Sequence, residues 1–184
     1  MIWFTADLHL GHESLATQKR GFSSLEAMER TIIQNTNIKV APTDTLYVLG
    51  DFSYRCTVEH ARALRKKIVC RKVHLICGNH DKDWSRPEVA HTFVLDSPLM
   101  RMKTEEGQML VLCHYPLLSW EGMHRGSIML HGHIHSGQGE AAPGSYNTRM
   151  RDEGTLRYDV GVDANDMAPI SLDEILAWFA HTEP

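Results

Sequence analysis

Five short apolar runs in this chain end directly in side chains that can bind metal ions. Each run is rich in Val, Ile, Leu or aromatic residues, which is typical of a buried strand. The side chains that follow these runs are Asp7 and His9, Asp51, Asn79 and His80, His114, and His133 and His135. In open α/β sheets, ligands collect beyond the carboxyl ends of the strands. The pattern therefore predicts one metal site, assembled from five segments that are distant in the sequence.

The spacing within the segments supports shared ligation of metal ions. Asp7 and His9 are two residues apart, as are His133 and His135. If the strands continue in extended form, side chains at i and i+2 point the same way, so Asp7 and His9 can reach one cation and the two histidines project toward the same side. Asp51 follows a glycine that permits a tight turn, and its two carboxylate oxygens can serve two cations. Each motif alone is common in loops, so the prediction depends on their combination.

The segment Gly78-Asn79-His80-Asp81 adds a candidate catalytic group. Asn79 offers a neutral amide oxygen, which suits a hard or borderline divalent ion. His80 can face the substrate instead of the metal. We expect Asp81 to hold the imidazole ring of His80 in one orientation, as carboxylates commonly do for working histidines. His80 and Asp81 are therefore predicted to act in catalysis.

This set of ligands suits hydrolysis of a phosphoester. Two cations roughly 3.5–4 Å apart can clamp the phosphate oxygens and generate a bridging hydroxide near neutral pH. His80 could stabilise the leaving oxygen or donate a proton to it. Nitrogen and oxygen ligands without a thiolate suit Mn, Fe, Zn, Ni or Co. We expect divalent ions at this site, with Mn as the first choice among these metals.

The rest of the chain supplies elements that could position these side chains. Strands are expected over residues 1–6, 46–49 and 73–77, with helices over 25–38 and 58–68 between them, which is the order of parallel crossover units. Ser23 with Glu26, Thr57, and Ser171 with Glu174 are the expected helix caps. The second half is richer in antiparallel pairing. Further strands are expected over 93–95, 99–104, 109–113, 128–131 and 157–162, a Gly-rich loop over 136–154 and a last helix over 172–180.

Composition limits the class of protein. The 184 residues are expected to form a single domain, 1–184, and the net charge of −4 gives no support for nonspecific attraction to nucleic acid or membranes. The basic cluster over residues 62–72 is interpreted as a solvated helix face. No apolar run reaches the roughly 18 residues that cross a bilayer. Four cysteines without a C-x-x-C pair predict reduced thiols and a cytoplasmic location.

The joint order D-x-H, G-D, G-N-H-D, H and G-H-x-H, over residues 7–135, resembles the signature of the calcineurin-like metallophosphoesterase superfamily. The resemblance implies an α/β fold, a four-layer α/β/β/α sandwich with two mixed central sheets. It also implies two metal ions, one shared ligand and a catalytic His80. By the matching motifs, the first ion would be held by Asp7, His9 and His135, the second by Asn79, His114 and His133, and Asp51 would bridge them.

Within this superfamily the chain resembles the small single-domain phosphoesterases more than the protein Ser/Thr phosphatases. Protein Ser/Thr phosphatases carry G-D-x-V-D-R-G after the bridging aspartate, whereas this chain has G-D-F-S-Y-R-C over residues 50–56. The sequence looks more like the small single-domain phosphoesterases of bacteria and phages. We therefore expect a phosphodiesterase acting on a small or nucleotide-like substrate, with a phosphomonoesterase as the alternative. A non-catalytic scaffold is disfavoured because all seven ligands and His80 are present.

Several residues outside the ligand set are candidates for supporting roles. His12, Arg20 and Arg55 lie in or near the motif loops and could bind a phosphate oxygen. Asp163 and Asn165 follow the last strand and could support the metal ligands from behind. The expected partner is a small phosphoester or nucleotide, with no membrane and no stable nucleic-acid partner. Homodimer formation stays open, and the loop over 136–154 could serve as a rim of the site or as a dimer contact.

Overall fold

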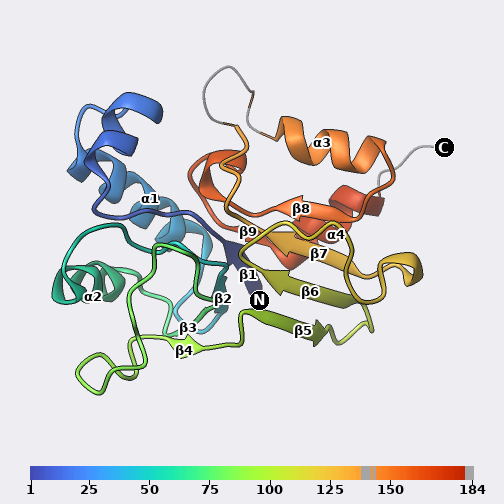
Figure 1. Ribbon diagram of the computed structural model, residues 1–184, viewed down its shortest axis with the longest axis horizontal. Coiled ribbons are helices and arrows are strands. Elements are labelled where there is room, and N and C mark those ends of the chain that lie inside the picture. The colour runs from blue at the N-terminus through green and yellow to red at the C-terminus, as the bar shows by residue number, and fades with distance from the viewer. Residues whose placement is uncertain (138–141, 143, 181–184) are drawn as a thin grey trace.

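Two β-sheets pack face to face in the computed structural model of the chain, and helices flank them (Figure 1). The structure describes residues 1–137, 142 and 144–180. The first sheet has the order β4-β3-β2-β1-β9, and only β9 is antiparallel to its neighbour. Its strands are β1 (Ile2–Thr5), β2 (Thr45–Val48), β3 (Lys72–Leu75), β4 (Val94–Leu95) and β9 (Ile170–Ser171).

The second sheet has the order β5-β6-β7-β8. Its strands are β5 (Leu99–Lys103), β6 (Met109–Cys113), β7 (Ile128–His131) and β8 (Arg157–Asp159). The pair β5–β6 is antiparallel, in line with the antiparallel pairing expected in the second half, whereas β6, β7 and β8 are parallel. Both sheets are mixed, and the expected α/β architecture with two mixed sheets is confirmed.

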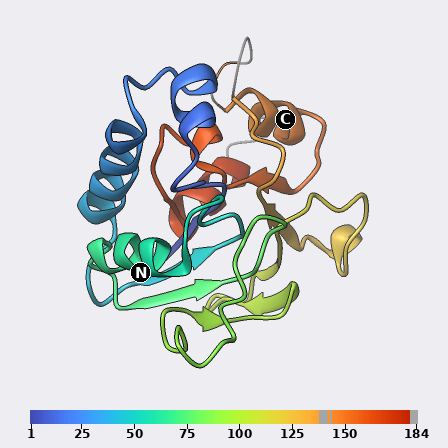
Figure 2. The ribbon, with the colours of Figure 1, turned by 60° about the vertical axis from the view of Figure 1, so that its left-hand side comes forward.

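Helix α1 (Leu25–Lys39) and helix α2 (Val58–Lys67) cover the outer face of the first sheet (Figure 2). Alternate strand residues, such as Leu46 and Val48, face these helices and are fully buried among their apolar side chains. Each such burial removes apolar area from water and contributes about 1.5–3 kcal/mol. This cluster fixes α1 and α2 against the sheet whose strand ends carry Asp7, Asp51 and Asn79.

The space between the two sheets is filled by the other alternation of residues. Phe4 and Leu49 from the first sheet meet Leu112 and Leu130 from the second, and all four are completely buried. Helix α4 (Leu172–Ala180) packs on β1 and β9 and adds Ile175 to this core. The core locks the two sheets together, so that their strand ends meet at one edge of the molecule.

The helix caps follow the sequence with one shift. Thr57 accepts a hydrogen bond from the backbone N–H of His60, as expected for the start of α2. The expected capping box at the start of α4 is present, because Ser171 Oγ accepts from the N–H of Glu174 and the Glu174 carboxylate accepts from Ser171. The cap of α1 is Ser24, not Ser23, since Ser24 Oγ accepts from the N–H of Ala27.

Part of the expected loop over 136–154 is a helix. Helix α3 (Ser145–Asp152) begins after Gly144, whose φ of 75° turns the chain, and it packs against β8. Its sequence is polar and too short to show a helical repeat, so periodicity could not reveal it. Residues 138–141 and 143 of that loop lie outside the described residues. No helix in the described ranges combines the length and hydropathy that a membrane crossing requires.

Candidate metal centre

The ligand-bearing segments meet beyond the carboxyl ends of β1, β2, β3, β6 and β7. Backbone hydrogen bonds join these loops, with Asp7 N–H donating to the Gly50 carbonyl at 3.0 Å and His9 N–H to that of Asp51 at 2.9 Å. Gly132 N–H donates to the His114 carbonyl at 3.0 Å and ties two loops of the second sheet together. The edge of the sandwich therefore gathers the segments that the sequence pattern singled out.

Two groups of ligand atoms form within this edge. Asp7, His9 and His135 each place one ligand atom within 4.8 Å of the others. Asp7, Asp51 and His114 form a second such group. The Nε2 atoms of His9 and His135 are 3.0 Å apart, so the two rings face one another across the first group.

The remaining expected ligands lie beside His114. Its Nε2 is 3.0 Å from Asn79 Oδ1 and 3.2 Å from His133 Nδ1. Asp51 lies between the two sides of the site, because its Oδ2 is 3.5 Å from Nε2 of both His9 and His114. The seven residues are thus side by side, with the Asp51 carboxylate in the central position.

The protonation of these histidines suits metal binding. His114 Nδ1 is 2.9 Å from the Leu49 carbonyl, which can only accept, so Nδ1 carries the proton and Nε2 keeps its lone pair. Burial, and after it the neighbouring His135, lowers the pKa of His9 to about 2, which keeps that ring neutral. Neutral imidazoles are the form that binds metals.

An orphaned carboxylate oxygen tests whether a cation fits. Asp7 is fully buried, and its Oδ1 has no hydrogen-bond partner among the described residues, while Oδ2 accepts from His133 N–H at 2.8 Å. Burial, followed by the nearby Asp159 and Asp51, raises the pKa of Asp7 well above its usual range. Burying a carboxylate oxygen that accepts no hydrogen bond is costly unless a cation compensates its charge. The donor set therefore fits divalent ions.

The backbone at the ligands differs from the expected continuation of the strands. Left-handed φ values are uncommon for residues other than glycine, and they cluster at functional sites. Five of the seven expected ligands adopt them: Asp7 (57°), His9 (49°), Asp51 (55°), His133 (73°) and His135 (49°). The expectation that i and i+2 converge through extended backbone is therefore wrong, although the side chains of Asp7 and His9 do converge.

Two of the glycines before the ligands are required by close packing. A Cβ at Gly50 would overlap the ring of His114, and a Cβ at Gly132 would overlap Ala6 and the carboxylate of Asp7. Glycine at these positions lets loops from different strands approach closely enough to share a site.

Arg20 does not bind substrate in this arrangement, contrary to expectation. Its side chain is fully buried, and each of its five N–H groups has an acceptor. Nε and Nη2 donate to Asp163 at 2.8 and 2.6 Å, and the other acceptors are the carbonyls of Asp7 and Leu8 and the sulfur of Met28. Arg20 therefore holds the first ligand loop and Asp163 in place.

Asp163 contacts the expected ligand His135 directly, as its expected supporting role requires. Its Oδ2 is 2.9 Å from Nδ1 of His135, and a carboxylate can only accept from that nitrogen. The contact orients the ring and directs Nε2 toward His9. Asn165 has a different place: its amide donates to the carbonyls of Asp159 and Gly161 and supports the loop that carries Asp163.

Asp81 also differs from expectation, because it does not contact the ring of His80. Its carboxylate accepts three backbone N–H groups, from Asp51 at 2.8 Å, Gly78 at 2.9 Å and Phe52 at 2.9 Å. Burial raises the pKa of Asp81 to about 6. Asp81 therefore fastens two ligand loops together. Its position next to His80 in the sequence could not reveal which partner it chooses.

His80 lies at the rim of the site. Its N–H donates to Asp51 Oδ1 at 2.9 Å, while its ring is 5.5 Å from that of His9. Tyr54, which the sequence analysis did not identify, packs edge-on against His80 at 4.9 Å and stacks on His12 at 3.7 Å. The Arg55 guanidinium lies 5.1 Å from the centre of the Tyr54 ring. His12 and Arg55 thus border the site beside His80.

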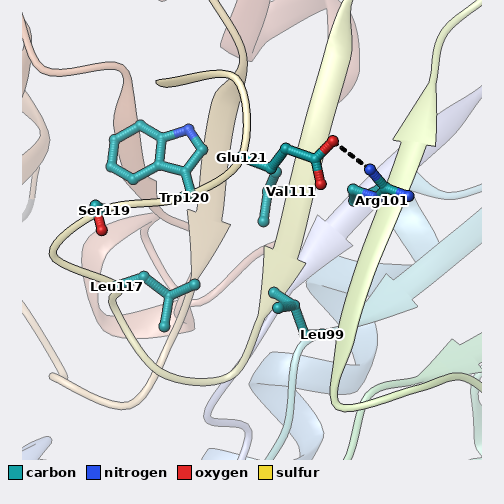
Figure 3. Close-up of a pocket in the computed structure, with 7 residues that line it drawn as sticks. All are labelled: Leu99, Arg101, Val111, Leu117, Ser119, Trp120 and Glu121. Atoms are coloured by element: carbon teal, nitrogen blue, oxygen red, sulfur yellow. Dashed lines mark hydrogen bonds and ion pairs between the residues drawn. The ribbon is translucent and has the colours of Figure 1, made fainter. Parts of the chain in front are cut away.

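A separate cavity of about 450 Å³ lies on the outer face of the second sheet (Figure 3). It is lined by Leu99, Arg101, Val111, Leu117, Ser119, Trp120 and Glu121, and none of these is an expected ligand. Arg101 is paired with Glu121 across this cavity, so its charge is already compensated. The cavity therefore does not offer the cationic surroundings that a phosphate group requires.

Buried carboxylates and neutral imidazoles at adjacent positions are the donor set that a metal site requires. The family model of the calcineurin-like phosphoesterases matches residues 1–176, and the chain belongs to this family. Membership establishes the coarse activity, which is metal-dependent hydrolysis of phosphoesters.

Similar proteins occur in a phage and in an archaeon. The chain is 28% identical over 167 residues to the Gene 66 protein of Mycobacterium phage L5, covering 73% of this chain and 77% of that protein. It is 28% identical over 177 residues to the uncharacterized protein MJ1445 of Methanocaldococcus jannaschii, covering 95% and 89%. The crystal structure of AQ665 from Aquifex aeolicus, a protein of unknown function, superimposes with a TM-score of 0.72 at 24% identity, covering 96% of this chain and 98% of that one. This last similarity concerns the fold.

Proposed function

We propose that the chain is a dinuclear phosphodiesterase acting on small or nucleotide-like substrates. The observation that carries the dinuclear part is the position of Asp51, whose Oδ2 is equidistant, at 3.5 Å, from His9 and His114 on the two sides of the site. One carboxylate between two groups of ligands is the arrangement that a shared ligand needs. Nitrogen and oxygen ligands without a thiolate suit Mn, Fe, Zn, Ni or Co, and Mn is our first choice.

The roles of the residues follow from their positions. Asp7, His9 and His135 would hold one ion, Asn79, His114 and His133 the other, and Asp51 both. When bound, divalent ions at such a site polarise phosphoryl oxygens and lower the pKa of water.

His80 lies beside the first group of ligands and is held there by its own N–H and by the ring of Tyr54. Its imidazole can donate a hydrogen bond or a proton to the leaving oxygen. His12 and Arg55 lie on the same side and can donate hydrogen bonds to phosphate oxygens that do not take part in bond cleavage.

The test compares a diester with a monoester on one metal-depleted preparation. Bis-p-nitrophenyl phosphate and p-nitrophenyl phosphate are assayed after addition of Mn, Co, Ni or Zn, and bound metal is counted per chain. We expect two ions and a higher kcat/KM for the diester, and we expect Asp51→Asn to lose both metal and activity. Asp96→Asn, which alters a carboxylate paired with His74 instead of a ligand, is the matched control.

Each outcome decides a part of the proposal. Hydrolysis of neither ester with any of the four metals would end the proposed activity. A preference for the monoester would replace the phosphodiesterase with a phosphomonoesterase. One ion per chain would remove the shared role of Asp51.

A further inference from the structure

An aromatic side chain lies exposed at the rim of the metal centre. Tyr115 follows the expected ligand His114 directly, and 44% of its surface is accessible. Its ring centre is 4.9 Å from that of His114 and 4.7 Å from that of His133, with interplanar angles of 71° and 65°. Tyr115 therefore touches two of the three residues that would hold the second ion, yet it is not part of the core.

The local sequence explains why this ring stays outside. Strand β6 ends at Cys113, whose side chain is buried on the outer face of the second sheet. Pro116 disfavours helical backbone at Tyr115, and the chain bends at His114 and Tyr115 as it leaves the strand. The ring is thus carried past the strand end to the edge of the site.

The two sides of the site differ in chemistry. On the side of His9, the neighbours are His80, His12 and Arg55, which can donate hydrogen bonds to phosphate oxygens. On the side of His133, the exposed residues besides the expected ligand Asn79 include Tyr115 and the aliphatic Ile134, which follows His133 in the chain and is 37% accessible. A substrate that spans both sides would present phosphate to the first and a flat apolar group to the second.

We propose that Tyr115 is the stacking surface for the nucleobase of a nucleotide substrate whose phosphate lies at the metal centre. The inference rests on the proposed function and adds the substrate class to it. A base joined to the phosphate through one sugar can reach a ring that contacts the ligands themselves. Stacking is tolerant of base identity because every base has a π-face. Tyr115 would thus favour nucleotides over other phosphoesters without selecting one base over another.

The test separates the base from the phosphate by comparing two ligands. Adenosine 5′-monophosphate and ribose 5-phosphate carry the same phosphorylated sugar, and only the first has a base. Their dissociation constants are measured calorimetrically on the Mn-loaded chain, as wild type, Tyr115→Ala, Tyr115→Phe and Leu118→Ala. Leu118 is the matched control because it lies in the same loop and is 92% accessible. Metal content and circular dichroism verify that each variant is folded and loaded.

We expect Tyr115→Ala to weaken binding of adenosine 5′-monophosphate by about fivefold or more, the range of base–aromatic stacking. Binding of ribose 5-phosphate should not change, and Tyr115→Phe and Leu118→Ala should resemble the wild type. Equal loss for both ligands would assign Tyr115 to the support of His114 and His133 and overturn the proposal. No loss for either ligand, or equal affinity of the wild type for both, would also overturn it.

These failures can be told apart from failure of the proposed function. If the wild type hydrolyses bis-p-nitrophenyl phosphate but binds adenosine 5′-monophosphate no more tightly than ribose 5-phosphate, the enzyme assignment stands and the stacking role falls. If the wild type neither hydrolyses the diester nor binds either ligand, both proposals fall.

Discussion

Replacing Asp163 by Asn tests whether a side chain behind the site controls metal binding. The carboxylate is 1% exposed and contacts both Arg20 and His135. Burial alone would raise the pKa of Asp163, but hydrogen bonds from His135 and Arg20 outweigh it and hold that pKa well below its usual range. Asn has nearly the same shape but no charge, so the variant isolates the electrostatic contribution.

Two separate effects are expected from Asp163→Asn. The Arg20 guanidinium, whose side chain is fully buried, loses its counter-ion, and the loss of one partner of a buried pair costs about 3–5 kcal/mol of unfolding free energy. His135 no longer donates to a carboxylate, and losing such a partner weakens metal affinity about 10- to 100-fold. That factor corresponds to about 1.4–2.7 kcal/mol of binding free energy. Urea unfolding of the metal-free chain measures the first effect, and chelator competition with Mn²⁺ measures the second.

A double variant separates the two effects. In Arg20→Gln with Asp163→Asn, no buried charge is left uncompensated, so much of the stability should return while metal affinity stays low. Asp96→Asn removes a carboxylate 2.8 Å from Nδ1 of His74 and should leave metal affinity unchanged. Wild-type metal affinity in folded Asp163→Asn would refute the reasoning, and so would full recovery of affinity in the double variant.

Three further predictions concern His80, Asp81 and Glu174. His80→Ala should retain its metal, measured by mass spectrometry, and lose turnover by about 10²-fold or more, whereas loss of metal would make His80 a ligand. Asp81→Asn should lower the urea unfolding free energy by about 1–3 kcal/mol, because an amide cannot accept the three backbone N–H groups as a carboxylate does; unchanged stability with reduced turnover would contradict the fastening role. Burial alone would raise the pKa of Glu174, but hydrogen bonds from Ser171 outweigh burial and lower that pKa. The ionised carboxylate therefore stabilises the fold at pH values above the usual pKa of a glutamate. Glu174→Gln should therefore be less stable at pH 7, and the difference should shrink as the pH falls below about 4, through the lowered pKa of the folded state; a pH-independent difference would oppose this assignment.

The sequence by itself predicted the candidate ligands and determined the strands that carry them. A ligand is recognised by residue type and by its place after a buried apolar run, and both are local properties. The same holds for the crossover order of the first half, the β5–β6 hairpin and the caps at Thr57 and Ser171. The seven ligand candidates could therefore be named before any contact was known, and the structure places them together at one edge.

Only the tertiary structure decided what the supporting residues do. Arg20 has five donors, but its main acceptor, Asp163, is 143 positions away in the chain and meets it only after the sheets have packed. Asp81 could have faced His80, yet its carboxylate accepts hydrogen bonds from three converging backbone N–H groups instead. Tyr54 and Tyr115 carry no sequence signal, because aromatic residues are as common in cores as at sites. The left-handed backbone at the ligands is likewise imposed by the packing of separate loops, since no local preference of Asp or His would hold it alone.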